Sequence, residues 1–182
     1  YHGDEEYLQS QREYLVQLLD LLLTKVDDMG FETSGGGFLD WPSNANQPAM
    51  RAGTQALMMW AMKSGEELCN YLGEEQMAAR CKECYDKMVA AAPTVVEQYF
   101  KEAQHPTAPG SKQGAALMAL AGIIDAKEAN DKVLTVEGAR GFSTFYGYYM
   151  LQAMAKAGDY EGAMQVIRDF WGAMLDLGAT SF

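Results

Sequence analysis

The chain has 182 residues, 48% of them hydrophobic and 21% charged, a balance typical of a folded domain with a sizeable core. Its net charge of −11 disfavours nucleic acid and anionic membranes as partners, because both would repel it and no basic cluster offers a local exception. No run of about 18 apolar residues occurs, so the sequence predicts no transmembrane helix.

The first predicted helix covers residues 4–28. Its acidic start suits the positive end of the helix dipole. Its apolar residues recur at steps of three and four, the spacing of an amphipathic helix; they are Leu8, Leu15, Leu18, Leu19, Leu22 and Val26. Because the chain begins at Tyr1 and enters this pattern almost at once, we expect it to be a segment of a longer protein.

A long irregular segment, residues 35–46, follows in a chain that otherwise predicts helix after helix. Three glycines, residues 35–37, permit positive φ angles or a close approach to a ligand, and Asp40 places a carboxylate beside the apolar ring of Trp41. This pairing suits a sugar, whose ring faces are apolar while its edges need hydrogen bonds. The alternative is that Phe38 and Trp41 plug the end of a helical bundle.

Two longer helices are predicted next. The second helix covers residues 48–71, with Pro48 at the first helical position. The third covers residues 74–92, where Pro93 is expected to break or kink the helix before a short continuation. Residues 105–110, rich in proline and glycine, are expected to form a loop.

The last third of the chain predicts four more helical segments. Ser111 is a candidate N-cap for a helix of small residues at 113–124, which would let neighbouring helices approach closely. We expect a short polar helix at 126–133, an irregular segment after it, and helices at 143–157 and 160–177. About seven helices joined mostly by short turns require antiparallel neighbours, so helical hairpins are the expected building unit.

The turn around Gly158 resembles that of tetratricopeptide repeats. The comparable turn glycines, Gly73, Gly122 and Gly158, are 49 and 36 residues apart, whereas that repeat needs about 34 residues each time. A regular solenoid is therefore disfavoured. Unequal hairpins with long loops at one end match an α/α toroid better.

The three cysteines, Cys69, Cys81 and Cys84, cannot all pair within the chain, so we expect buried free thiols. A metal site is not expected, because structural zinc needs four ligands and both histidines, His2 and His105, are remote in sequence. No motif for a cofactor is present.

Three carboxylates lie in predicted irregular regions: Glu32, Asp40 and Glu137. Glycoside hydrolysis needs two acids, one protonated and one ionised, although each of these residues is more often a solvated loop acid or a helix cap. No nucleophile motif such as GxSxG or HExxH competes with them.

A run of aromatic residues begins the helix predicted at 143–157. It could form a wall facing a ligand, or residues such as Phe145 and Tyr149, four positions apart, could pack into the core. The full run is Phe142, Phe145, Tyr146, Tyr148 and Tyr149.

Four segments together resemble one family. Residues 1–4, Tyr-His-Gly-Asp, precede an amphipathic helix; residues 38–41 read Phe-Leu-Asp-Trp; residues 141–144 read Gly-Phe-Ser-Thr; and residues 174–182 read Met-Leu-Asp-Leu-Gly-Ala-Thr-Ser-Phe. Over almost its whole length the chain resembles the central to late part of the catalytic α/α toroid of bacterial α-L-rhamnosidases, in which an aspartate-tryptophan loop lies beside the bound sugar.

This resemblance implies an all-α fold in which residues 1–182 are one fragment of a larger catalytic toroid of the six-hairpin type, incomplete in this chain. It implies an inverting glycoside hydrolase that acts on rhamnose-containing glycans or glycosides. The sequence leaves the compartment unknown, and a periplasmic or otherwise extracytoplasmic location is the guess for a bacterial glycan-degrading parent protein. The resemblance places the general acid upstream of Tyr1 and the general base beyond Phe182. We therefore expect no catalytic residue, metal or cofactor in this chain, and no activity from the fragment alone.

The resemblance also assigns roles in substrate binding. Asp40 is expected to hydrogen-bond sugar hydroxyls, Trp41 to stack on the pyranose, and Phe38 and Phe142 to line the rim. The expected partners are the carbohydrate and the remainder of the toroid, and self-association is expected if helix faces made for missing neighbours are exposed. The alternative, from another class, is a tetratricopeptide-like helical-repeat module that binds a peptide or protein without catalysis.

Overall fold

The computed structural model describes residues 3–35, 38–41, 45–102 and 105–181. These residues are mostly helical, and none of them lies in an extended strand, although an isolated bridge joins Val26 and Glu32. The expected all-α class is therefore confirmed. No helix in these four ranges combines the length and the apolar character needed to cross a bilayer.

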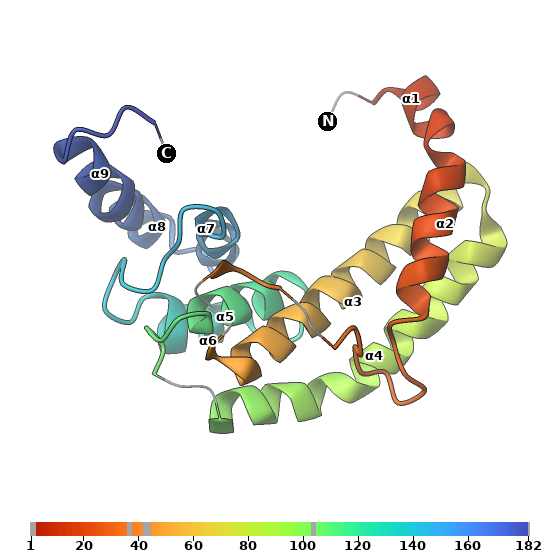
Figure 1. The fold of residues 1–182 in the computed structure, drawn as a ribbon, viewed down its shortest axis with the longest axis horizontal. Helices are drawn as coiled ribbons and strands as arrows, with labels where there is room; N and C mark the ends of the chain where they lie inside the picture. The colour runs from red at the N-terminus through yellow and green to blue at the C-terminus, as the bar shows by residue number, and fades with distance from the viewer. Residues whose placement is uncertain (1–2, 36–37, 42–44, 103–104, 182) are drawn as a thin grey trace. The chain divides into compact units, whose positions relative to one another are not determined.

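The chain divides into two compact units. The first consists of Tyr1–Gly35 and Leu57–Ala92, and the second of Gly36–Ala56 and Pro93–Phe182. The two longest helices, α3 (Gln47–Leu72) and α4 (Glu75–Glu102), each contribute one part to each unit (Figure 1).

In the first unit, the helix predicted at 4–28 is two helices, α1 (Glu5–Ser10) and α2 (Arg12–Leu23). A single residue, Gln11, separates them, and the Ser10 hydroxyl just before it donates to the carbonyl of Tyr7. After α2, the Asp27 carboxylate accepts from two backbone N–H groups and closes a turn. Ion pairs from Arg12 to Glu74 and from Arg80 to Asp20 hold α2 to the other helical part of this unit.

The core of the first unit contains the three cysteines, all of them buried and free, as expected. Leu19 packs on Gly65, where a Cβ atom would lie 2.7 Å from a Leu19 methyl. Burial is the main cause that raises the pKa of the Cys81 thiol from 9.0 to about 11, with smaller contributions from Cys69 and Cys84. Thiols with raised pKa values are poor nucleophiles, which fits a packing role.

Pro93 was expected to break or kink the third helix before a short continuation. The continuation is present, since α4 runs through the proline to Glu102, and the helix does not break there. Proline removes one helical N–H and crowds the preceding turn, at a cost of about 3 kcal/mol. Buried side chains on both sides of the proline, including Ala92 and Val95, supply packing that offsets this cost. The division of α4 between the two units falls at this residue.

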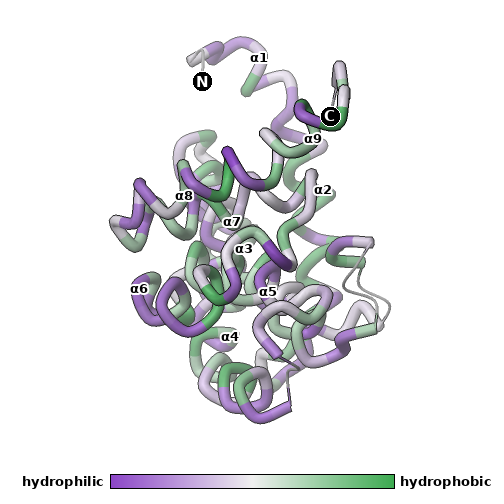
Figure 2. Tube along the Cα trace, turned by 90° about the vertical axis from the view of Figure 1, so that its left-hand side faces the viewer, coloured by the Kyte–Doolittle hydropathy of each residue, from purple (hydrophilic) through white to green (hydrophobic). Residues whose placement is uncertain are grey.

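The second unit is built around α5 (Ser111–Leu120), which is buried from Ser111 to Ala119. Helices α6 (Ala126–Ala129), η2 (Asn130–Leu134) and α7 (Gly147–Lys156) pack against it (Figure 1). The middle of α6 is hydrophilic, with Lys127 and Glu128 between two alanines, as the colours along α6 in Figure 2 show. The small residues of α5 do permit close packing, since a Cβ at Gly114 would lie 2.8 Å from the Ala49 carbonyl oxygen.

Three further segments complete the second unit: α8 (Tyr160–Ile167), η3 (Arg168–Gly172) and α9 (Ala173–Asp176). The helix predicted at 160–177 is thus present but contains a π-helical turn, as does the one predicted at 126–133. The helix predicted from Ser143 begins only at Gly147. Ser111 is not an N-cap, because Gly110 occupies that position at φ 87° and Ser111 lies inside α5.

Candidate functional site

Three consecutive polar side chains at the start of α5 are fully buried: Ser111, Lys112 and Gln113. Buried polar groups are normally satisfied by protein partners, and a lysine is rarely buried at all. Each of the three contacts a different irregular segment of the second unit. The start of α5 therefore joins several loops at one place.

Ser111 joins the segment that precedes α3. Its hydroxyl accepts a hydrogen bond of 3.0 Å from the Asn46 amide, whose own oxygen accepts from the backbone N–H of Ala49. The Ser111 carbonyl also accepts from the Tyr99 hydroxyl at 2.8 Å, and burial raises the pKa of that phenol. These bonds attach α3 and α4 to the start of α5.

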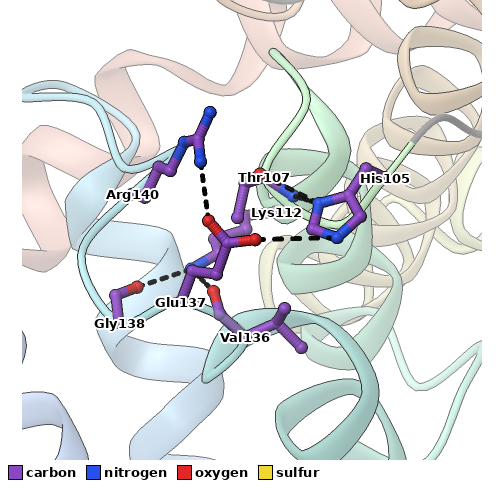
Figure 3. Close-up of polar contacts among 7 residues, drawn as sticks. All are labelled: His105, Thr107, Lys112, Val136, Glu137, Gly138 and Arg140. Atoms are coloured by element: carbon purple, nitrogen blue, oxygen red, sulfur yellow. Dashed lines mark hydrogen bonds and ion pairs between the residues drawn. The ribbon is translucent and has the colours of Figure 1, made fainter.

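Lys112 joins the segment that precedes α7. Its Nζ donates to the carbonyl oxygens of Val136 at 2.9 Å and Gly138 at 2.6 Å (Figure 3). The same Nζ lies 5.0 Å from the ring centre of Phe142. Burial lowers the pKa of this lysine from 10.5 to about 8, and the negative charge of Glu137 opposes that shift.

The two carbonyl groups that accept from Lys112 belong to the residues on either side of Glu137. Residues 136–141 are called the Glu137 turn below. Glu137 has a φ of 53°, a left-handed conformation that is uncommon for any residue with a Cβ atom. Its carboxylate lies 2.8 Å from the Arg140 guanidinium and 3.6 Å from the His105 ring, and Figure 3 shows these groups together. Gly141, at φ 87°, packs against Thr107.

Gln113 joins the aromatic loop, residues 38–41, through the carboxylate of Asp40. The Gln113 amide donates to Asp40 Oδ2 at 3.1 Å, and the Ser143 hydroxyl donates to the same oxygen at 2.6 Å. The other oxygen accepts from the backbone N–H of Trp41 at 2.9 Å. With 3% of its surface exposed, Asp40 directs both oxygens toward protein donors.

The two rings of the aromatic loop lie at the surface, with Trp41 79% exposed and Phe38 53% exposed. They meet edge to face, with centroids 5.0 Å apart and planes at 86°. This exposure contradicts the alternative interpretation that the rings plug a bundle. Leu39, between them, is buried against Gly53 of α3.

The aromatic run after the Glu137 turn divides between core and surface. Phe142 and Tyr146 are buried, while Phe145 and Tyr148 are exposed. The alternative that these rings pack into the core therefore holds for Phe142 and Tyr146 but not for Phe145. Phe142, expected at a rim, lies beneath the surface with its ring beside the Lys112 ammonium.

These contacts form a closed ring. Lys112 holds the Glu137 turn, and Ser143, two residues after that turn, donates to Asp40. Asp40 also accepts from Gln113, the neighbour of Lys112. This closed set of contacts supports Trp41, because the backbone N–H of Trp41 donates to Asp40. Its chemical capacity is to present two aromatic rings in a fixed orientation.

The remaining candidate carboxylate, Glu32, lies in the first unit, where it accepts from the backbone N–H of Ser34 at 2.6 Å. Within the described ranges, no group of three or more His, Cys, Asp or Glu residues could hold a metal ion. Part of the predicted irregular segment lies outside the described residues, namely Gly36, Gly37 and residues 42–44. The same holds for three residues of the motifs that resemble the rhamnosidase family: Tyr1, His2 and Phe182.

Sequence reasoning singled out Asp40 and Trp41 but missed the residues that hold them. Ser143 carried a weak signal, because it belongs to the Gly-Phe-Ser-Thr segment at 141–144. Lys112 and Gln113 carried none, since polar residues in the first turn of a helix are usually solvated.

Comparison of the chain with protein-family models, with curated proteins and with solved structures found no match. What the site can do is therefore inferred from its own residues and their geometry.

Proposed function

We propose that this chain is a segment of the toroid of an α-L-rhamnosidase-like inverting glycoside hydrolase, and that its aromatic loop recognises the sugar. The observation that carries the proposal is the exposed pair of rings, Phe38 and Trp41. Their loop is held by the carboxylate of Asp40, which is buried and accepts hydrogen bonds from Gln113 and Ser143. An exposed tryptophan held by a buried anchor favours a binding role, since packing alone would cover the ring.

The chemistry of this surface suits an uncharged carbohydrate. The faces of the two rings can pack against the C–H groups of a pyranose, and they do so at little entropic cost because the loop is already held in place. A net charge of −11 disfavours anionic ligands. Rhamnose, with an apolar methyl group, is the sugar that the resemblance implies.

The proposal gives each residue a distinct role. Trp41 stacks on the sugar and Phe38 lies beside it, while Asp40 holds the loop, because a sugar hydroxyl would have to reach a carboxylate that is 3% exposed. Phe142 is buried, with its ring beside the Lys112 ammonium that holds the Glu137 turn. Catalysis is assigned to the remainder of the toroid, where an inverting mechanism needs two carboxyl groups about 6.5–9.5 Å apart.

The packing of the second unit supports a toroid built from helical pairs. Helix α7 packs against both α5 and α8, and Gly158, at φ 85°, makes the tight turn between α7 and α8. Successive helices joined by such turns are the elements from which hairpin toroids are assembled.

The test is a titration of the 182-residue chain with methyl α-L-rhamnopyranoside, followed by calorimetry or by NMR chemical shifts. We expect binding that Trp41→Ala weakens by about tenfold or more, equivalent to about 1.4 kcal/mol. Tyr160→Ala is the matched control, because Tyr160 is a similarly exposed ring on α8. Equal affinity in Trp41→Ala and the original chain would reject the loop as the sugar site.

A second assay tests the assignment of catalysis. The chain is expected to leave an aryl α-L-rhamnoside intact. Measurable turnover would show that the acid and base have been placed wrongly.

The alternative, a helical module that binds a peptide or protein, is favoured by one observation. Helix α8 exposes Tyr160, Met164 and Ile167 on a helix capped by Asp159, next to the tetratricopeptide-like turn. Selection from a displayed peptide library would distinguish the two functions. Peptide binding that Met164→Asp abolishes and Trp41→Ala preserves would favour the module.

A further inference from the structure

We propose that Lys112 is a positioning residue for the aromatic loop and, through it, for the ligand. The part that concerns the ligand rests on the proposed carbohydrate function. Lys112 acts on Trp41 through the Glu137 turn, Ser143 and Asp40.

The first argument is the burial of Lys112. A fold that needed only to fill this position would place an apolar side chain there, because burying an ammonium group is costly. Lys112 is instead fully buried, with its Nζ between the carbonyls of Val136 and Gly138 and over the ring of Phe142. The charge is therefore placed where it holds a turn from two sides.

The second argument is the conformation of the turn that Lys112 holds. Glu137 adopts a left-handed φ of 53°, which persists only where the surroundings fix it. Both carbonyls flanking Glu137 accept hydrogen bonds from Lys112 Nζ, and Figure 3 shows the ammonium group between them. Without Lys112, the turn loses both of these backbone hydrogen bonds and keeps only the contacts of the Glu137 carboxylate with Arg140 and His105, so we expect the residues that follow to shift.

The third argument is the path from the turn to the loop. Ser143 follows Phe142 directly and donates a 2.6 Å hydrogen bond to Asp40, whose other oxygen holds the backbone N–H of Trp41. A shift of the turn therefore moves a donor to Asp40. Gln113 provides a second donor to the same oxygen, so the loop is held from two sides as well.

The experiment compares Lys112→Met with Lys156→Met in the full 182-residue chain. Lys156 is the matched control, because its Nζ also donates to two carbonyls of the α5 region, Ala119 at 2.8 Å and Leu120 at 3.2 Å, at the opposite end of that helix. Tyr99→Phe is a second control that removes a buried hydrogen bond at the start of α5.

The first readout is hydrogen exchange of the Trp41 backbone amide, which needs no ligand. We expect Lys112→Met to accelerate this exchange by about tenfold or more relative to the helix interiors, because the acceptor Asp40 becomes less well fixed. Lys156→Met and Tyr99→Phe should leave it unchanged. Unchanged Trp41 exchange in Lys112→Met would overturn the proposal, as would equal acceleration in all three variants.

The second readout is the affinity for methyl α-L-rhamnopyranoside in a double-mutant cycle. Lys112→Met and Ser143→Ala should each weaken binding by about five- to tenfold and together by less than the product, because they act on one path. Independent, multiplicative effects would reject that path. Absence of binding by the unsubstituted chain would reject the proposed function, while the exchange readout would still decide the role of Lys112.

A further variant covers the case in which Lys112→Met does not fold. Lys112→Arg keeps the positive charge, but its planar guanidinium cannot replace a compact ammonium group between two carbonyls. We expect accelerated Trp41 exchange with a smaller loss of thermal stability. Native Trp41 exchange in Lys112→Arg would show that the charge alone is sufficient and that the geometry of Lys112 does not position the loop.

Discussion

The buried charge of Lys112 makes a pH-dependent contribution to stability. Its pKa is about 8 in the folded chain against 10.5 ordinarily, so between these pH values the folded state binds fewer protons than the unfolded state. Stability linked to this residue therefore rises with pH. Relative to Lys112→Met, the unsubstituted chain should gain up to about 3 kcal/mol of unfolding free energy from below pH 8 to above pH 10.

Urea denaturation at a series of pH values measures this difference. The pKa values of Cys81 and Tyr146 are raised to about 11 and about 12, so these groups lower stability as pH rises above their unfolded pKa values. Both residues are present in both proteins, so their contributions to the difference cancel. A difference that does not vary with pH would show that Lys112 titrates as an ordinary lysine.

Asp40 should matter more for folding than an ordinary loop acid. Asp40→Ala leaves three donors without their acceptor, from Gln113, Ser143 and Trp41, and should destabilise the chain by about 3 kcal/mol. Thermal unfolding monitored by circular dichroism measures the loss. Glu32→Ala is the comparison and should cost less than about 1 kcal/mol; equal losses would contradict the anchoring role of Asp40.

Single residues were predictable from the sequence only where their chemistry was visible locally. The pair Asp40 and Trp41 stood out because a carboxylate beside an indole in an irregular segment is informative by itself. Lys112 did not, because its burial depends on the Glu137 turn, which lies more than twenty positions away. Long-range partners of this kind cannot be read from local spacing.

Helix α5 is constrained by close contact with α3. Gly114→Ala would place a Cβ atom 2.8 Å from the Ala49 carbonyl oxygen, an atom of the backbone that cannot move alone. The expected cost is about 1–3 kcal/mol, although alanine is the better helix former.

Gly172→Ala is the matched control for this substitution. At that helical glycine the nearest atom to a new Cβ lies at 4.0 Å, so alanine should stabilise the chain by about 0.5–1 kcal/mol. We expect the urea midpoint of Gly114→Ala to lie below that of the unsubstituted chain and the midpoint of Gly172→Ala to lie above it. Stabilisation by both would contradict the close approach of α5 and α3.

The existence of the helices was predictable, whereas their ends were not. Periodic apolar residues identify α2, α3 and α8 because amphipathic spacing is a property of the segment itself. The break allowed at Pro93 does not occur, because burial on both sides of the proline outweighs its local preference against a helix. The start of α7 was predicted at Ser143 but lies at Gly147, and Ser143 instead donates its hydroxyl to Asp40 in another segment.

Helices α3 and α4 each run without interruption from one compact unit into the other. Because a helix is cooperative along its length, we expect the two units to unfold in one transition. The three buried thiols all belong to the first unit and give a local probe of it.

Reaction of the thiols with a chromogenic disulfide reagent across a urea series tests this expectation. Thiol reactivity and loss of Trp41 amide protection, which reports on the second unit, should share one midpoint. Two separate midpoints would show that the units unfold independently.

For the molecule as a whole, helical periodicity was enough to predict the all-α class. The proposed toroid rests on the resemblance and on the packing of α5, α7 and α8. A larger assembly of helices depends on contacts between elements, which periodicity within a segment does not encode.

In the proposed sugar site, contact with the ligand and support of the loop fall to different residues. Phe38 and Trp41 are exposed, whereas Asp40, Gln113 and Lys112 are buried. Substitutions at the two ring positions should therefore alter ligand preference at little cost to folding, which makes them suitable positions for a randomised library. In evolutionary terms, the same division would let ligand preference diverge while the supporting residues stay fixed.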